Sequence, residues 1–213
     1  HRETIVGWDK GTGTPSDHAS VWQDRRPNEI CKNLVNKNYT NLIQEKTGLI
    51  IDPYFSASKI QWLLENIKDQ QNLIVGTIDT WIIWNLTNKS KHVTDITNAS
   101  RTMLYNITTE IWDDELLKLF KIRKSILPTV LSNKDEYGTI HFEHFGIEIP
   151  IGGVVGDQQS ASLGQLCLKK GMIKATYGTG CFVLINTDKN KITSKNKLLT
   201  TVASKIDKKK INW

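Results

Sequence analysis

Residues able to do chemistry gather in one stretch of the chain, residues 149–182. There a run rich in glycine and apolar residues ends at Asp157, and a helical pattern follows directly. A strand that stops at one carboxylate before a helix brings that carboxylate to the edge of a sheet, where ligands bind. Gly178-Thr179-Gly180 follows, and two glycines around a threonine let a tight turn offer several backbone N–H groups to one anion. An acid beside an anion-binding turn indicates phosphoryl transfer.

Each of these features also has a purely structural interpretation. A carboxylate at Asp157 could cap the following helix, because it would accept hydrogen bonds from free backbone amides. Gly178-Thr179-Gly180 could be a plain hairpin turn, and Trp22 and Tyr54 taken alone would be core aromatic residues. The residues themselves leave these alternatives open, so the choice depends on the wider pattern.

The elements expected around these residues mix strands and helices, which indicates the α/β class. Residues 4–9 and 19–23 are expected to form an antiparallel hairpin, and residues 72–76 and 94–102 to be loops. Apolar spacing predicts helices at residues 28–35, 42–47, 56–67 (with Ser56 as its cap), 77–86, 115–120 and 158–167. Strands are expected at residues 136–142 and 149–155, and hairpins at 173–176 with 181–186 and at 198–204 with 211–213.

Composition is that of a folded, soluble protein, with 38% hydrophobic and 23% charged residues among 213. The net charge of +6 invites a nucleic-acid partner, yet the lysines are scattered, and only Lys208-Lys209-Lys210 form a run. We therefore expect a solvated basic surface and no nucleic acid. The three cysteines lie far apart, and no apolar stretch approaches the roughly 20 residues that span a bilayer. These features favour a cytoplasmic protein without a membrane span.

Six segments in a fixed order form a further pattern over nearly the whole chain. They are Arg2-Glu3-Thr4, residues 22–26, residues 52–62, residues 98–102, residues 156–159 and residues 177–182. Together they resemble the FGGY family of carbohydrate kinases, and within it the members that phosphorylate glycerol. The resemblance implies the two-domain, actin-like and ribonuclease H-like ATPase fold. It places an N-terminal domain, incomplete at its start, over residues 1–165 and the beginning of a C-terminal domain over residues 166–213.

The same resemblance implies ATP-dependent phosphorylation of glycerol to sn-glycerol 3-phosphate. Asp157 is implied to be the catalytic base, and Gly178, Thr179 and Gly180 to contact the phosphates of ATP. Mg²⁺ would bridge those phosphates through water and ATP oxygens, with no metal ligand assigned to the protein. The residues implied to hold glycerol are five polar side chains and two aromatic ones: Arg2, Glu3, Tyr54, Asp157, Gln158, Trp22 and Phe182.

The chemistry of glycerol independently calls for such a set. A small triol has three hydroxyl groups and almost no apolar surface, so recognition needs charged donors, carboxylate acceptors and an amide. Groups left unpaired by a substrate that lacks a hydroxyl cost roughly 1–3 kcal/mol each. A site that recognises each hydroxyl group by hydrogen bonds therefore discriminates well against molecules that lack one.

Parts of the family pattern lie beyond both ends of the sequence. The family's first phosphate hairpin precedes His1, and its adenosine site follows Trp213, so we expect an internal fragment that is inactive alone. The alternatives are a kinase for another polyol or a ketose, a non-catalytic remnant, and a basic module that binds nucleic acid. Whether the subunits form a homo-oligomer is left open.

Overall fold

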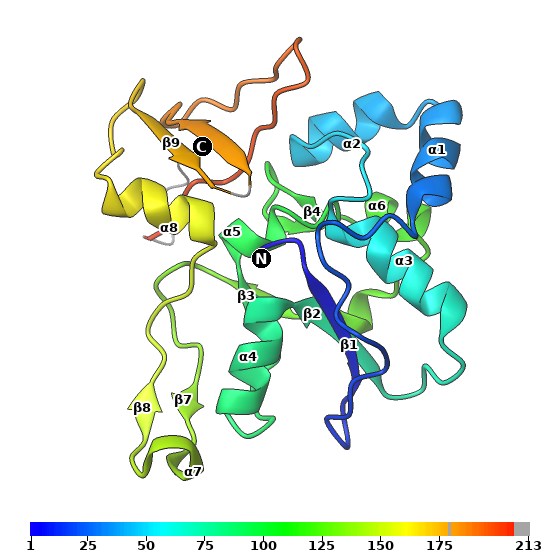
Figure 1. Ribbon diagram of the computed structural model, residues 1–213, viewed down its shortest axis with the longest axis vertical. Coiled ribbons are helices and arrows are strands. Elements are labelled where there is room, and N and C mark those ends of the chain that lie inside the picture. The colour runs from blue at the N-terminus through cyan, green and yellow to red at the C-terminus, as the bar shows by residue number, and fades with distance from the viewer. Residues whose placement is uncertain (179, 207–213) are drawn as a thin grey trace.

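The computed structural model describes residues 1–178 and 180–206, and it shows a mixed α/β arrangement (Figure 1). At its centre β1 (Ile5–Asp9) pairs antiparallel with β2 (Leu73–Thr77), with Ile5 opposite Thr77. Beside them β3 (Val93–Asp95) pairs in parallel with β6 (Thr129–Leu131). His92 links the two pairs, because its Nε2 donates to the Val75 carbonyl at 3.0 Å.

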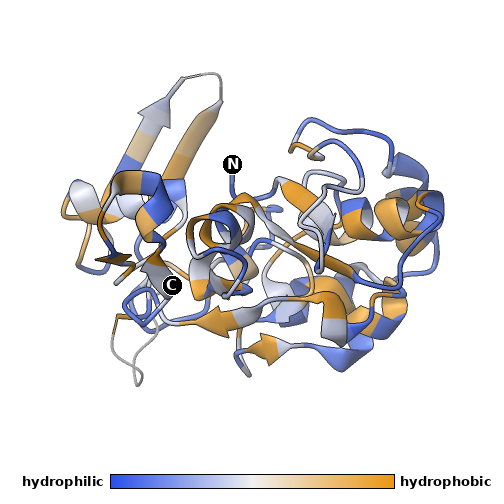
Figure 2. Ribbon diagram, turned by 90° about the horizontal axis from the view of Figure 1, so that it is seen from below, coloured by the Kyte–Doolittle hydropathy of each residue, from blue (hydrophilic) through white to orange (hydrophobic). Residues whose placement is uncertain are grey.

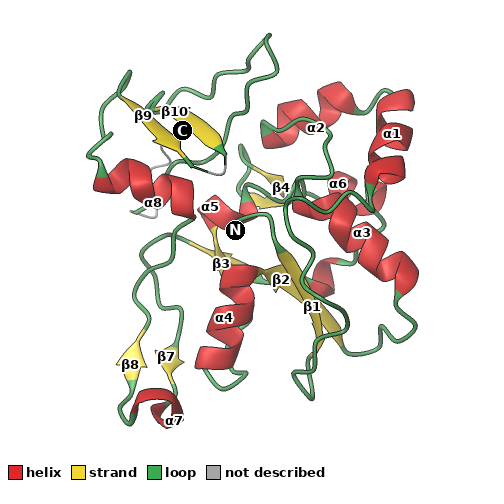
Figure 3. Ribbon diagram, viewed as in Figure 1, coloured by secondary structure: helices red, strands yellow, loops and turns green. Residues whose placement is uncertain are grey.

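Helices cover this centre on the side that carries the main hydrophobic core (Figure 3). The helix α3 (Ser56–Asn66) packs on β1, and α1 (Asn28–Asn36), α2 (Thr40–Thr47) and α6 (Asp114–Leu119) lie around it. In Figure 2 the central strands are largely hydrophobic, whereas the outer loops are hydrophilic. The sides of these elements that meet therefore exclude water, which is the main stabilising contribution to the fold.

The helices expected in this region are confirmed, as is the helix over residues 77–86, which is α4 (Ile78–Leu86). Gly48 ends α2 at a φ of 72°, a conformation that glycine adopts without strain. Ser56 is not the cap of α3: Phe55 holds that position, and the Ser56 hydroxyl donates instead to the Glu3 carbonyl at 3.3 Å. The first turn of α3 is thereby tied to the residues before β1.

A smaller unit follows the main body, at upper left in Figure 1. It consists of α8 (Asp157–Gly164) and a hairpin of β9 (Ile173–Tyr177) and β10 (Cys181–Ile185), with Cys181 opposite Tyr177. The helix and the hairpin expected here are confirmed. After the hairpin the chain returns to the main body, where the Val202 side chain is fully buried in the main core.

Several expectations about strands and loops were wrong. Residues 72–76 belong to a buried strand, β2, and residues 94–102 hold the end of β3 and the short helix α5 (Ile96–Ala99). Residues 19–23 form no strand: on the edge of β1 away from β2, Ser20 makes a single bridge to Ile5. The strands expected at 136–142 and 149–155 shrink to a short pair, β7 (Thr139–Ile140) and β8 (Ile149–Pro150), joined through α7 (Phe142–Phe145).

The remaining described elements are short. They are β4 (Tyr105–Asn106) paired with β5 (Ile111–Trp112), and a 3-10 turn at Lys124–Ile126. Residues 198–204 form no strand, and residues 211–213, the other half of that expected hairpin, lie outside the described residues. Within residues 1–178 and 180–206 no helix has the length and apolar character needed to cross a membrane.

Candidate active site

A pocket of about 420 Å³ opens where the first residues of the chain meet α8 and the β9–β10 hairpin. All seven residues expected to hold glycerol line it, although they come from five separate parts of the sequence. The two described glycines of the expected phosphate turn line it as well, whereas Thr179 lies outside the described residues. The lining includes Arg2, Glu3, Trp22, Tyr54, Asp157, Gln158, Gly178, Gly180 and Phe182. The fold thus brings the acid and the turn to one cavity.

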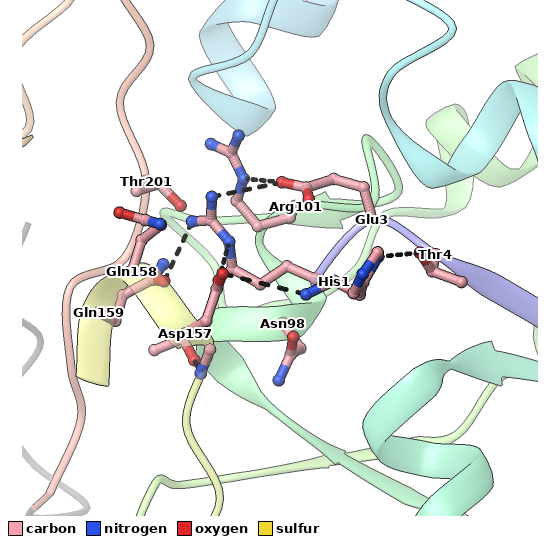
Figure 4. A network of polar contacts seen from close by, with 12 residues as sticks. His1, Glu3, Thr4, Asn98, Arg101, Asp157, Gln158, Gln159 and Thr201 are labelled. Atoms are coloured by element: carbon pink, nitrogen blue, oxygen red, sulfur yellow. Dashed lines mark hydrogen bonds and ion pairs between the residues drawn. The ribbon is translucent and has the colours of Figure 1, made fainter. Parts of the chain in front are cut away.

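Arg2 contacts three polar residues on one side of the pocket, and Figure 4 labels all three: Glu3, Asp157 and Gln159. Its guanidinium is buried and forms an ion pair with Asp157, with 2.9 Å between Nε and Oδ1. Another nitrogen donates to Gln159 Oε1 at 3.1 Å, and a third lies 3.6 Å from Glu3 Oε1. Burial and the neighbouring Arg101 lower the pKa of Arg2, while the two carboxylates raise it. The carboxylates therefore offset the cost of burying this charge.

Glu3 contacts two buried guanidinium groups through one oxygen. Arg101, which is only 4% exposed, donates from Nε to Glu3 Oε1 at 2.9 Å, and Arg2 lies 3.6 Å from the same oxygen. The Arg101 guanidinium also lies 5.1 Å from the centre of the Phe55 ring. The sequence alone assigns no role to Arg101, because it does not show which carboxylate would pair with this arginine in the folded protein.

Asp157 is the first residue of α8, and Gly156 occupies the cap position. Its carboxylate accepts no capping hydrogen bond from α8, so the helix-cap interpretation does not describe this residue. The side chain is 55% exposed and points toward Arg2 at the pocket. A carboxylate that is anchored on one side and open on the other can accept a proton from a bound molecule.

Gly156 permits the close passage of Arg2 beside α8. A Cβ atom at this position would lie 2.8 Å from Arg2 Cδ and 2.9 Å from Gln159 Oε1, both too close for any larger residue. The Gly156 amide donates to Thr97 Oγ1 at 2.8 Å, which ties the start of α8 to α5. Glycine is therefore required here by contact with neighbours.

Asp95 anchors the segment that leads to Asp157, and it does not pair with Arg101. It is fully buried and caps α5, accepting from the backbone amides of Thr97 at 2.7 Å and Asn98 at 3.3 Å. Asn133 donates both to Asp95 at 2.7 Å and to the Val154 carbonyl at 2.9 Å. Burial, and then the charge of Asp79, raises the pKa of Asp95 to about 6.

Trp22 and Tyr54 form the aromatic wall of the pocket. Both are partly exposed, and their ring centres lie 5.8 Å apart. The buried Lys59 donates to the Pro53 carbonyl at 3.2 Å and also to the Tyr54 carbonyl, which fixes the loop before α3. Burial lowers the pKa of Lys59 to about 8. Both aromatic residues therefore line the cavity, and Tyr54 also packs against the main core.

The opposite wall is the end of the β9–β10 hairpin. Phe182 lies on β10, and its ring reaches back over Gly180, where a Cβ atom would lie only 2.8 Å from Phe182 Cε2. Gly178 donates its amide to the Gly180 carbonyl at 3.1 Å. The absence of a side chain at Gly180 thus leaves room for the aromatic ring beside exposed backbone.

Comparison with known proteins agrees with this arrangement. Residues 1–164 match the model of the FGGY family of carbohydrate kinases, N-terminal domain. A glycerol kinase from Malacoplasma penetrans is 53% identical over 98% of the chain. The structure of Plasmodium falciparum glycerol kinase with ADP is 43% identical, covers 99% of the chain and superposes with a TM-score of 0.94. A gluconate kinase from Lactobacillus acidophilus, 23% identical over 99% of the chain with a TM-score of 0.85, shares the fold.

Fold and family agree with each other: the chain has the actin-like ATPase fold of its structural relatives, as expected from the sequence. The chain belongs to the FGGY family. It spans 43% of the length of the Malacoplasma relative, 44% of the Plasmodium structure and 43% of the gluconate kinase.

Proposed function

We propose that a protein containing this chain transfers the γ-phosphoryl group of ATP to glycerol, giving sn-glycerol 3-phosphate. The observation that carries the proposal is the pocket, because it combines a guanidinium, two carboxylates, an amide and aromatic walls in a space suited to a small polyol. Curated relatives more than half identical to the chain are glycerol kinases, which supports the choice of substrate.

In the proposed reaction Asp157 is the general base. The exposed oxygen of Asp157 accepts the proton of a terminal hydroxyl group of glycerol. The oxygen of that hydroxyl group forms a bond to the γ-phosphorus, while the bond between the γ-phosphorus and the bridging oxygen breaks and ADP leaves. Arg2 holds the carboxylate through the ion pair at 2.9 Å and fixes its direction. A base of this kind contributes on the order of 10²–10⁴-fold, and positioning supplies most of the remaining acceleration.

The phosphates of ATP are proposed to lie against the turn between β9 and β10. Gly178 and Gly180 line the same pocket as Asp157, and glycine at both positions lets a phosphate approach the backbone closely. Residues 1–178 and 180–206 contain no group of three His, Cys, Asp or Glu side chains that could hold a metal ion. Mg²⁺ is therefore proposed to be carried by phosphate oxygens and water, neutralising their charge.

The second candidate substrate, left open by the sequence, is another polyol or a ketose. A coupled assay that measures ADP production with glycerol, xylulose and gluconate separates the two in a polypeptide of the relatives' full length. We expect turnover of glycerol and little of the sugars. Turnover of xylulose or gluconate alone would overturn the choice of glycerol. We further propose a cytoplasmic location, while an assembly of identical subunits is a matter for sedimentation analysis.

A further inference from the structure

Lys174 is a buried lysine directly behind the pocket. It lies on β9, where the side chains of Ile173 and Ala175 are exposed while Lys174 is only 1% exposed. Because alternate residues of a strand share a face, Lys174 lies on the same face as Thr176, which lines the pocket. Lysine is almost never buried without a partner. The position therefore demands an acceptor nearby.

That acceptor is Gln158. The Lys174 ammonium donates to Gln158 Oε1, so it joins β9 to the first turn of α8. An ammonium has hydrogen-bond donors and no acceptor, so the oxygen of the amide must face it and the nitrogen must face away. Gln158 Nε2 donates to no residue in the part of the chain that the structure describes, and Gln158 lines the pocket. Its two N–H groups are thus left for a molecule in the pocket.

The adjacent glutamine provides a contrast. Gln159 Oε1 accepts from Arg2 at 3.1 Å, and Gln159 Nε2 donates to the Val202 carbonyl at 3.1 Å. Both ends of that amide are satisfied within the protein, so Gln159 has a structural role. Within residues 1–178 and 180–206, Gln158 has one end of its amide bound by a buried cation and no partner at the other end, unlike Gln159.

We propose that Lys174 is a positioning residue that holds the Gln158 amide as a hydrogen-bond donor to a hydroxyl oxygen of the substrate. This inference rests on the proposed phosphorylation of glycerol. Without the ammonium the amide can rotate and present its oxygen, which cannot donate to a hydroxyl oxygen. Lys174 therefore acts on recognition of the substrate and does not touch the reacting atoms.

A double-mutant cycle tests the inference in a polypeptide of the relatives' full length. We expect Lys174→Met to raise the KM for glycerol about tenfold, the effect of losing one charge-assisted interaction, with kcat changed less than about twofold. In a Gln158→Ala background the same substitution should raise KM no further, because its effect passes through the amide. Lys174→Arg should restore most of the affinity. Lys170→Met, at an exposed lysine four residues earlier, is the matched control and should leave KM unchanged.

Gln158→Glu keeps the test decisive if Lys174→Met does not fold. The carboxylate would form an ion pair with Lys174 and preserve the fold, yet it offers no donor, so KM should rise as much as in Gln158→Ala. Additive effects of Lys174→Met and Gln158→Ala, or an unchanged KM in Gln158→Glu, would overturn the inference alone. A wild-type protein that phosphorylates xylulose but not glycerol would overturn the proposed function, and the inference with it.

Discussion

At the scale of single residues, the pocket depends on a row of charged side chains in which each charge lies beside one of opposite sign. Arg101 pairs with Glu3, Glu3 lies near Arg2, and Arg2 pairs with Asp157, so positive and negative groups alternate. Only the last of them, Asp157, is substantially exposed. Charged side chains that are paired and shielded from solvent keep a fixed geometry. This geometry leaves the Asp157 carboxylate accessible to a substrate.

Gly156 offers a test of how much this geometry matters. We expect Gly156→Ala to lower kcat/KM for glycerol at least tenfold, because the added methyl group would displace Arg2 from Asp157. The change in unfolding free energy should be only about 1–3 kcal/mol, typical of overpacking at one site. Steady-state kinetics and urea unfolding provide the two measurements.

The matched control for this substitution is Gly152→Ala. Gly152 lies in the same loop, and a Cβ atom there meets nothing within 4 Å. Its kinetics should therefore equal those of the wild type. Equal kinetics for both alanine variants would contradict the view that Gly156 serves the passage of Arg2.

At the scale of elements, His92 joins the two strand pairs of the main body. Besides its bond to Val75, its ring meets Trp8 and Trp84 edge-on, with ring centres 5.5 and 6.1 Å away. Burial lowers the pKa of His92 to about 4. The folded protein thus keeps His92 neutral at pH values where the unfolded chain, with a pKa near 6.5, has bound a proton.

This difference predicts a specific loss of stability in acid. As the pH falls from about 6.5 to about 4, protonation favours the unfolded chain, and below about 4 the effect is complete. We expect the wild type to lose on the order of 2–3 kcal/mol relative to His92→Gln over this range. The glutamine can donate to Val75 but does not titrate. Urea unfolding of both proteins at pH 7, 5.5 and 4 measures the difference, and parallel pH profiles would show that His92 does not titrate in this way.

The sequence predicted the elements that have a strong period or a clear end. The helix α2, which stops at Gly48, and the β9–β10 hairpin were found at nearly their observed bounds. The strand β2 was missed because a short, wholly buried strand has no alternation of polar and apolar residues. The strands at residues 136–142 and 149–155 were predicted too long, since extended backbone that pairs with no neighbour has the same composition as a strand.

The site shows a similar division. Long motif matches indicated Arg2, Glu3, Asp157 and Gln158, and the fold brings them to one pocket. Arg101, Asp95 and Lys174 could not be assigned, because each acts through a partner that only the tertiary structure brings near. Residues that line the pocket could thus be recognised from the sequence more readily than the buried residues that hold them in place.

At the scale of the whole molecule, the pocket lies between the main body and the smaller unit. Arg2, Trp22 and Tyr54 come from the main body, whereas Asp157 and Phe182 come from α8 and the hairpin. The chain after the hairpin packs against the main body and forms hydrogen bonds to it. Val202 is buried in the main core, the Thr200 amide donates to the Gly48 carbonyl at 2.9 Å, and the Lys205 amide donates to Asn133 at 2.7 Å.

For the proposed phosphoryl transfer, we further propose that a small motion of one unit against the other opens and closes the pocket, since closure would exclude water, a competing nucleophile. Since the chain spans 43% of the length of its Malacoplasma relative, the complete cleft is to be tested in a polypeptide of that full length.

The central claim is that Asp157 removes a proton from glycerol held in this pocket. The most direct measurement compares wild type and Asp157→Asn in that full-length polypeptide, with kcat from the coupled assay and glycerol affinity from equilibrium binding. We expect kcat to fall by about 10²–10⁴-fold while the dissociation constant for glycerol changes by less than about tenfold. An Asp157→Asn protein that retains most of its kcat would contradict the account.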